Sequence, residues 1–242
     1  MRPWRPRGWR RSGSSDGGRA TATTVEIGSI RNGVPETVRV PAAHSGVGPI
    51  LLGRTPVTNR EYAAFLASGC GAAPPWWTDS DFSAPGQPVV GVSWGDAMAF
   101  CAWLSEAAGG RWLLPTQAQW EHAACGGLVA PATSWGDAIP DGEIPSGPLG
   151  GPWEVGRGTP NGYGLCDMGT IVHEWCLDWD RPGRRASRGG SWRHAVRWSS
   201  PSAKSSLAPD ARYSDYGFRV AMEVEAGPEL LDPPGAGHDI NR

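Results

Sequence analysis

No hydrophobic run in the 242-residue sequence is long enough to cross a membrane. The Arg-rich first residues are not followed by the apolar stretch that a secretory signal requires, although Arg10-Arg11 resembles a twin-arginine start. We therefore expect no membrane association and no export, and the default expectation is a cytoplasmic protein.

Cysteine is scarce, and neither sign of charge dominates. The five cysteines form no CxxC pair, and an odd number cannot be fully paired within one chain. This argues against a disulfide framework and against the common zinc motifs. The 22 basic and 24 acidic residues give a formal net charge of -2, so no global charge attracts nucleic acid or an anionic membrane surface.

Glycine, proline and tryptophan are abundant instead, with 35, 23 and 14 residues. Much glycine and proline indicates a chain rich in loops, whereas so many tryptophans argue against disorder. The two ends differ from this pattern: residues 1–22 are basic and rich in small residues, and residues 225–242 carry little apolar surface. We expect both ends to be disordered and the part between them to fold.

Three helices are predicted from capping residues that precede an apolar periodicity. Thr58, Ser93 and Thr116 are suitable N-caps, and an acidic residue follows the first two by three positions, as in a capping box. The helices are expected at residues 58–66, 93–104 and 116–124. Alternating or clustered apolar residues predict short strands at 24–27, 37–40, 49–53 and 88–92.

The stretch 188–219 is the strongest candidate for a functional site. Gly189-Gly190 can adopt backbone angles that other residues avoid, and Trp192 and Phe218 supply apolar surface to hold each end. Between these anchors the residues are polar and follow neither the helical nor the strand period. Proteins often present a site on a mixed loop held by a rigid frame, but an ordinary surface loop would have a similar sequence.

Two carboxylates indicate a cation site. Asp167 and Glu174 bracket a short segment that contains Gly169. Carboxylates combined with backbone carbonyl groups are the ligands that Ca²⁺ prefers. The alternative is a pair of acidic side chains that simply face solvent.

Five motifs, in order along the chain, carry a resemblance to a known family. They read PVTNREYAAFL, PVVGVSWGDAMAFCAWL, LLPTQAQWEHAACGG, NGYGLCDM…VHEWCLDW and RGGSW…GFR. Together they resemble the formylglycine-generating enzymes, also called sulfatase-modifying factor domains, over roughly residues 50–222. The resemblance implies an irregular, loop-rich α+β fold of the C-type-lectin-like kind, with short strands and a few helices, in one domain at residues 23–224.

The resemblance also implies an activity and an active site. The family's catalysts oxidise a sulfatase cysteine to formylglycine with O₂ and a copper ion, which two cysteines hold because soft thiolates select Cu(I). In this chain Ser191 matches the active-site serine, but His194 and Ser199 stand at the positions of the two cysteines. The resemblance therefore implies that a thiolate copper site cannot form here, and it leaves the oxidase activity open.

Other positions match the family only in part. An aromatic residue near the family's active site corresponds to His173, and a family glycine corresponds to Thr170. Two disulfide-forming cysteines of secreted members match Cys101 and Cys125, whose partners are absent here, and this favours a reducing compartment. A family calcium site is better preserved, and its ligands match the following residues: the side chains of Asp167 and Glu174 and the backbone carbonyls of Thr170 and Val172.

Three functional hypotheses follow. The first is an oxidase that acts on a sulfatase cysteine. The second is a non-catalytic, lectin-like module that binds a protein or peptide through polar and aromatic residues of the candidate loop: Arg193, Arg197, Trp198, Arg212, Tyr213 and Tyr216. The third, a special case of the second, is a target protein of a diversity-generating retroelement, since such proteins often share this fold.

Overall fold

The computed structural model describes residues 33–43, 45–140, 150–194 and 199–224. The two ends that we expect to be disordered and the predicted strand at residues 24–27 lie outside the described residues. Within the described part, no helix combines the length and the apolar character that a bilayer crossing requires.

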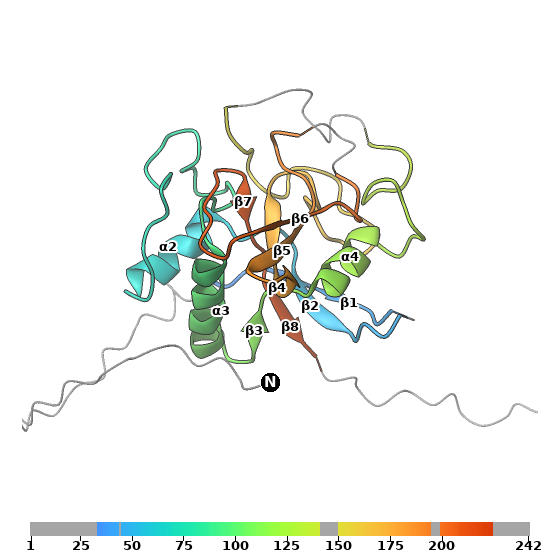
Figure 1. Cartoon of the computed structure of the whole chain (residues 1–242), viewed down its shortest axis with the longest axis horizontal. Coiled ribbons are helices and arrows are strands. Elements are labelled where there is room, and N and C mark those ends of the chain that lie inside the picture. Colours follow the sequence, from blue (N-terminus) through green and yellow to red (C-terminus); the bar gives the residue numbers. More distant parts are fainter. Residues whose placement is uncertain (1–32, 44, 141–149, 195–198, 225–242) are drawn as a thin grey trace, which may run out of the picture.

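Two four-stranded sheets form the framework of the domain (Figure 1). The first sheet is antiparallel and its strands, in spatial order, are β1 (Thr37–Val40), β2 (Ile50–Gly53), β8 (Ala221–Glu223) and β3 (Trp112–Leu113). The second sheet has the order β6 (Lys204–Leu207), β5 (Arg184–Arg188), β4 (His173–Arg181) and β7 (Tyr216–Gly217). Short strands, few helices and many loops confirm the predicted irregular α+β fold.

The three predicted helices are present and start at the predicted caps. They are α2 (Asn59–Ala67), α3 (Trp94–Ala108) and α4 (Gln117–Cys125). Thr58, Ser93 and Thr116 each form a complete capping box with the residue three positions later. The predicted strand at 88–92 was wrong: only Pro88 forms an isolated bridge, and Gly91 turns the backbone with a φ of 73°.

The cap of α3 gives a direct test of these assignments. Ser93 is buried, and its hydroxyl accepts from the backbone N–H of Asp96 at 3.1 Å and donates to the Asp96 carboxylate at 2.7 Å. We expect Ser93→Ala to lower the free energy of unfolding by about 1 kcal/mol, because the substitution leaves a helix N–H without its partner. Urea unfolding followed by circular dichroism measures this. Ser80→Ala, at an exposed serine, is the matched control and should stay within about 0.5 kcal/mol of the wild type.

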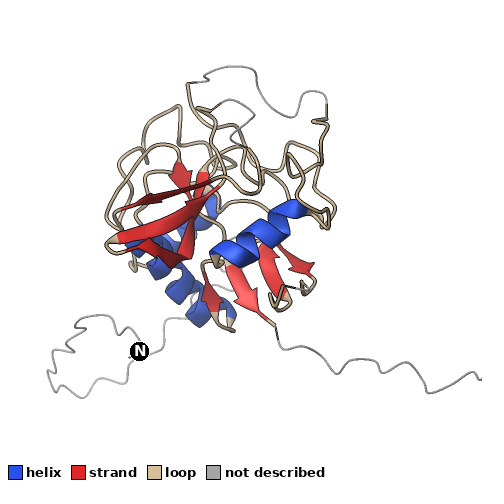
Figure 2. Cartoon of the chain, turned by 45° about the vertical axis from the view of Figure 1, so that its right-hand side comes forward, coloured by secondary structure: helices blue, strands red, loops and turns tan. Residues whose placement is uncertain are grey.

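The helices cover the framework with aromatic and apolar side chains. Tyr62 and Phe65 of α2 pack on Phe100 of α3, which in turn contacts Phe218 at a ring separation of 5.4 Å. Helix α4 packs against both sheets, because Trp120 shares a buried cluster with Ile50 of the first sheet and Cys176 of the second (Figure 2). Most of the long loops gather at one end of the molecule, opposite β3 and β8 (Figures 1 and 2).

A buried ion pair joins the two sheets. Glu174 of β4 and Arg219 are both fully buried, and the Arg219 Nε donates to the Glu174 carboxylate at 2.6 Å. Arg219 also donates to the backbone carbonyl of Gly53 in β2 at 2.9 Å. Because one guanidinium contacts both sheets, this pair fixes their relative position.

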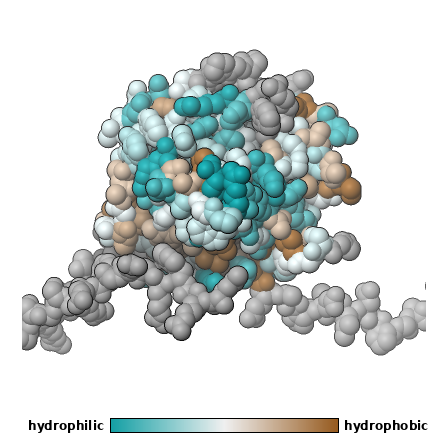
Figure 3. Space-filling model, viewed as in Figure 1, coloured by the Kyte–Doolittle hydropathy of each residue, from teal (hydrophilic) through white to brown (hydrophobic). Residues whose placement is uncertain are grey.

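The remaining surface offers few apolar contacts. The exposed large hydrophobic residues among the described ones are Leu128, Val129, Trp179 and Tyr213. On the face shown in Figure 3 the hydrophobic residues lie in small separate groups between hydrophilic ones. Large apolar patches mark many interaction sites, and this face shows none, so a functional site on it would rest on polar groups.

Candidate functional site

The candidate loop begins where two glycine-containing segments meet. Gly189 has a φ of 76°, which favours glycine, and a Cβ at this position would lie 2.6 Å from the Cα of Gly169. The backbone N–H of Gly190 donates to the carbonyl of Gly169 at 3.0 Å, and that of Trp192 donates to Ile171 at 3.0 Å. This close contact between backbones places Ser191 beside the start of β4.

Ser191 connects two ionisable residues. Its hydroxyl lies 3.0 Å from Oδ2 of Asp215 and 2.9 Å from Nδ1 of His194. A carboxylate can only accept, so the single hydroxyl hydrogen points to Asp215, and Nδ1 of His194 donates to the serine oxygen. In the neutral imidazole of His194, Nε2 is therefore the nitrogen that carries the lone pair.

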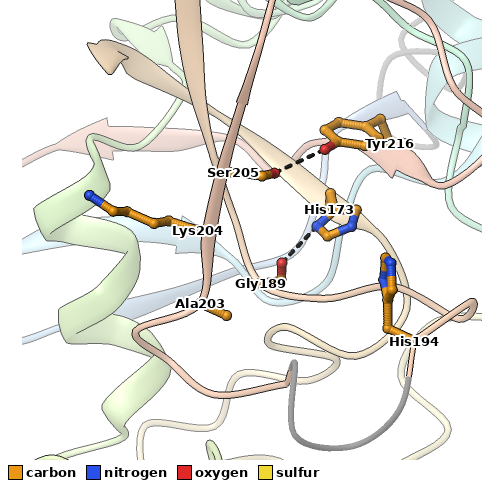
Figure 4. A pocket seen from close by; sticks show the side chains of 7 residues that line it. All are labelled: His173, Gly189, His194, Ala203, Lys204, Ser205 and Tyr216. Atoms are coloured by element: carbon orange, nitrogen blue, oxygen red, sulfur yellow. Dashed lines mark hydrogen bonds between the residues drawn. The ribbon is translucent and has the colours of Figure 1, made fainter. Parts of the chain in front are cut away.

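His173 stands next to this group at the first position of β4. Its Nδ1 lies 2.7 Å from the carbonyl oxygen of Gly189, and because a carbonyl only accepts, Nδ1 is the protonated nitrogen. The His173 ring lies 4.9 Å from that of His194 and 4.7 Å from that of Tyr216, measured between centroids (Figure 4). Burial lowers the pKa of His173 and favours the neutral imidazole, against the opposing effect of Asp215.

The two imidazoles face a cavity of about 420 Å³, which we call the His173 pocket. Its lining residues are His173, Gly189, His194, Ala203, Lys204, Ser205 and Tyr216 (Figure 4). The Tyr216 hydroxyl and Ser205 Oγ are hydrogen-bonded at 2.9 Å, and burial raises the pKa of Tyr216. A cavity of this size, with several polar groups converging on it, has the dimensions of a ligand site.

The structure brings some of the predicted loop residues to this pocket. Tyr216 and His194 line it, and Ser191 contacts it indirectly, through its hydrogen bond to the His194 ring. Tyr213 is half exposed, and its ring lies tilted against that of Tyr216 at a centroid separation of 5.7 Å. Arg193 is directed to Ser214 Oγ, to which its guanidinium donates at 2.5 Å.

Other predicted residues lie elsewhere. Arg212 is not among the residues that line the pocket, because its guanidinium forms an ion pair with Asp96 at the cap of α3. Ser199 is buried and is also absent from the lining. Arg197 and Trp198 lie outside the described residues.

Sequence reasoning gave no role to Asp215, Lys204 or Ser205, and it noted His173 only as a departure from the family. Lys204 and Ser205 reach the pocket because β6 pairs with β5, which precedes the candidate loop. His173 and Tyr216 meet because β4 and β7 pair in parallel, with these two residues directly opposite. The only sequence signal for Asp215 was its place beside the Gly217-Phe218-Arg219 motif.

The predicted calcium ligands are held by other partners. Both carboxylate oxygens of Glu174 accept from Arg219, at 2.6 and 2.8 Å, and Oε2 also accepts from the Trp120 indole at 2.7 Å. Asp167 Oδ2 accepts from the backbone N–H of Gly156 at 2.6 Å. A calcium ion bound by Glu174 would have to share this carboxylate with a buried guanidinium. The calcium site with Asp167, Thr170, Val172 and Glu174 stays a prediction from the sequence.

None of the five cysteines lies at a position that the resemblance assigns to a copper ligand. No cysteine is among the described residues that line the His173 pocket. Cys101, Cys166 and Cys176 are buried, and burial raises the pKa of each thiol. Cys125 is half-buried and Cys70 is exposed. At the two positions that the resemblance assigns to copper ligands, the chain offers an imidazole and a hydroxyl.

Comparison with known proteins places the chain in a single family. Residues 15–224 match the sulfatase-modifying factor enzyme 1-like domain. The formylglycine-generating enzyme of Streptomyces coelicolor is 28% identical over 80% of this chain and 84% of that protein. The bovine formylglycine-generating enzyme is 31% identical over 63% of this chain and 52% of its own length. Mouse inactive C-alpha-formylglycine-generating enzyme 2 is 34% identical over 57% of this chain and 49% of that protein.

Solved structures agree on the fold. Treponema denticola variable protein 1 superimposes with a TM-score of 0.64 at 22% identity, over 79% of this chain and 93% of that chain. CarF superimposes with a TM-score of 0.62 at 21% identity, over 80% and 95% of the two chains. These likenesses support the predicted fold class.

Proposed function

Because the chain belongs to the sulfatase-modifying factor enzyme 1-like domain family, we propose that it is a divergent member that binds a protein or peptide segment in the His173 pocket. In this proposal it does not make formylglycine through thiolate-bound copper. The observation that carries the proposal is the lining of the pocket, where imidazole and hydroxyl groups converge without a thiol.

The chemistry of the site supports this choice. Copper(I) is selected by soft thiolates, and the residues at the two ligand positions are His194 and Ser199. Cys176 of β4 is fully buried, and burial raises its pKa well above the ordinary value, so it stays protonated. The residues present do not fit the family's copper site, and we assign no step to that metal.

The chemical groups of the pocket suit a peptide segment. Tyr213 is exposed beside Tyr216 and offers an aromatic surface at the rim, while Ser205 and His194 offer hydrogen bonds inside. Tyrosine and histidine rings at a partly open cavity are typical of peptide recognition, since they combine apolar area with a polar tip. A relative named as an inactive enzyme, 34% identical over 57% of this chain, is consistent with a family member of this kind.

A selection of displayed random peptides tests the proposal. The selection is run in the presence of a chelator, so that metal ions play no part. We expect enriched peptides to bind the wild type and to bind Ala203→Phe at least about tenfold more weakly, a loss of about 1.4 kcal/mol, because the new ring fills the pocket. Val129→Ser, at a residue 96% exposed, is the control and should leave the affinity unchanged. Enriched peptides that bind Ala203→Phe as tightly as the wild type would contradict the proposal.

An oxidase that acts on a sulfatase cysteine is the second candidate. The observation in its favour is the Streptomyces coelicolor formylglycine-generating enzyme, whose alignment covers most of both chains. A sulfatase remains one possible partner under either proposal. The retroelement hypothesis and the cytoplasmic location stay predictions from the sequence.

A further inference from the structure

Three residues with metal-ligating side chains meet at the His173 pocket, and two of them line it. They come from three segments: His173 begins β4, His194 follows β5, and Asp215 precedes β7. One ligand atom from each lies within 4.8 Å of the other two. Among the described residues, this is the one such group of three or more histidine, cysteine, aspartate or glutamate side chains.

The hydrogen bonds prepare both imidazoles as ligands. Nδ1 of His173 donates to the Gly189 carbonyl and Nδ1 of His194 donates to Ser191, so that in the neutral form of each ring Nε2 carries the lone pair. Ligating histidines in metalloproteins are oriented in the same manner, by a partner on the second ring nitrogen.

The carboxylate is oriented as well. Asp215 is buried, and Ser191 donates to its Oδ2 at 3.0 Å. Within the described part of the chain, no group donates a hydrogen bond to Oδ1, the other carboxylate oxygen of Asp215. One serine hydroxyl therefore contacts two of the three side chains, and one oxygen of the buried carboxylate is free of hydrogen bonds from described residues.

We propose that His173, His194 and Asp215 bind one divalent first-row transition metal ion of the Zn²⁺ and Fe²⁺ class. Two imidazoles and one carboxylate are a common ligand set for such ions, and they leave further coordination positions open. His173 and His194 line the pocket, so the open positions face its interior. A donor group of the bound segment would occupy them, and only this last point rests on the proposed function.

Binding requires a small closure of the cluster. Metal–nitrogen distances of about 2.1 Å place neighbouring ligand atoms roughly 3 Å apart, which is closer than the present separation. His194 is exposed, so its ring can turn toward His173 and Asp215 without displacing core residues. Calcium and magnesium prefer oxygen ligands throughout and are not expected here.

Titration of the full chain with Zn²⁺ tests this inference. After treatment with EDTA and removal of the chelator, calorimetry should show one tightly bound equivalent of Zn²⁺ in the wild type, and Ca²⁺ should not compete for it. We expect His194→Ala and Asp215→Asn each to weaken Zn²⁺ binding by more than about 100-fold, since each removes a ligand, and Ser191→Ala to weaken it by about 10–100-fold. Addition of Co²⁺ in place of Zn²⁺ gives a second readout, because the visible absorption of bound Co²⁺ reports its ligands.

The control is His122→Ala, which removes a histidine on α4 whose ring contacts the Pro41 carbonyl and lies outside the cluster. It should bind Zn²⁺ and Co²⁺ like the wild type. The inference is overturned if the wild type shows no stoichiometric site, or if His194→Ala binds Zn²⁺ as tightly as His122→Ala does. Since the peptide selection is run with a chelator, failure of metal binding and failure of peptide binding are separate results.

Discussion

Glu174→Gln is expected to lower the free energy of unfolding by about 3–5 kcal/mol, because it leaves the charge of Arg219 buried without a counter-ion. Both side chains have no exposed surface, and two guanidinium nitrogens donate to the carboxylate at 2.6 and 2.8 Å. The neutral amide of glutamine removes the negative charge and turns one acceptor into a donor that faces the guanidinium. Trp120 would also lose a charged acceptor for its indole N–H.

Urea unfolding at neutral pH measures this loss. The control is Glu36→Gln, which removes the partner of Arg54 in an exposed ion pair with an N–O distance of 3.7 Å. Exposed pairs contribute about 0–1 kcal/mol, so the control should unfold close to the wild type. Equal losses for Glu174→Gln and Glu36→Gln would show that the buried pair does not hold the two sheets together.

Gly189→Ala is expected to destabilise the protein by about 2–5 kcal/mol, from two separate causes. The left-handed backbone at a φ of 76° costs a residue with a side chain about 1–2 kcal/mol. The new methyl group would also lie 2.6 Å from the Cα of Gly169, and overpacking of this kind costs about 1–3 kcal/mol. The backbone of residue 189 would have to move to relieve this contact. Because the Gly189 carbonyl accepts a hydrogen bond from His173, that movement would also disturb the pocket.

A matched substitution separates the two causes. Gly183 has a nearly identical φ of 74°, but a Cβ there would meet no atom within 4 Å. Gly183→Ala should therefore show only the backbone cost of about 1–2 kcal/mol. If thermal and urea unfolding gave the two alanine variants the same stability, the close contact between the Gly169 and Gly189 segments would be refuted.

Local signals predicted the helices well. The caps at Thr58, Ser93 and Thr116 depend on hydrogen bonds within three residues, so the sequence contains the whole interaction. The strand at 37–40 was also predicted with its observed bounds, and the strand predicted at 49–53 begins one residue later, at Ile50.

The sheet topology could not be predicted from local signals. β8 enters the first sheet between β2 and β3, and this pairing joins residues more than a hundred positions apart. The segment 88–92 is buried like a strand, but it does not continue as one because Gly91 turns the backbone. Apolar composition alone does not distinguish a buried turn from a buried strand.

In the turn after Cys166, the sequence did not show which residue adopts a positive φ. A glycine of the family is replaced by Thr170, which would strain the turn if this position required a positive φ. The positive φ values fall on Asp167 and Gly169 instead, at 58° and 78°, so Thr170 occupies a position that any residue can adopt. The sequence alone does not say which residue of a turn needs the unusual backbone angle.

The candidate site could be predicted only in part, because some of its residues meet only through contacts between segments that are distant in the sequence. Ser191 belongs to the RGGSW motif, and His194 and Tyr216 lie in the candidate loop between that motif and GFR; the structure brings the three residues together. Asp215 and His173 acquire their roles only through the parallel pairing of β4 with β7 and the approach of Gly189 to Gly169. Arginine is a residue type that often binds partners, but the ion pair of Arg212 with Asp96 holds its side chain at the cap of α3.

The most direct test of the proposed function is an assay for aldehyde formation. The full chain, supplied with copper, is incubated in air with a CxPxR peptide, and an aminooxy reagent reports any aldehyde; the Streptomyces coelicolor relative serves as the positive control. We expect no product above that of peptide and copper alone, because the chain has no cysteine beyond Cys176 to complete a thiolate pair. Aldehyde that accumulates with the wild type and disappears with His194→Ala would contradict this account and identify the protein as an oxidase with a different ligand set.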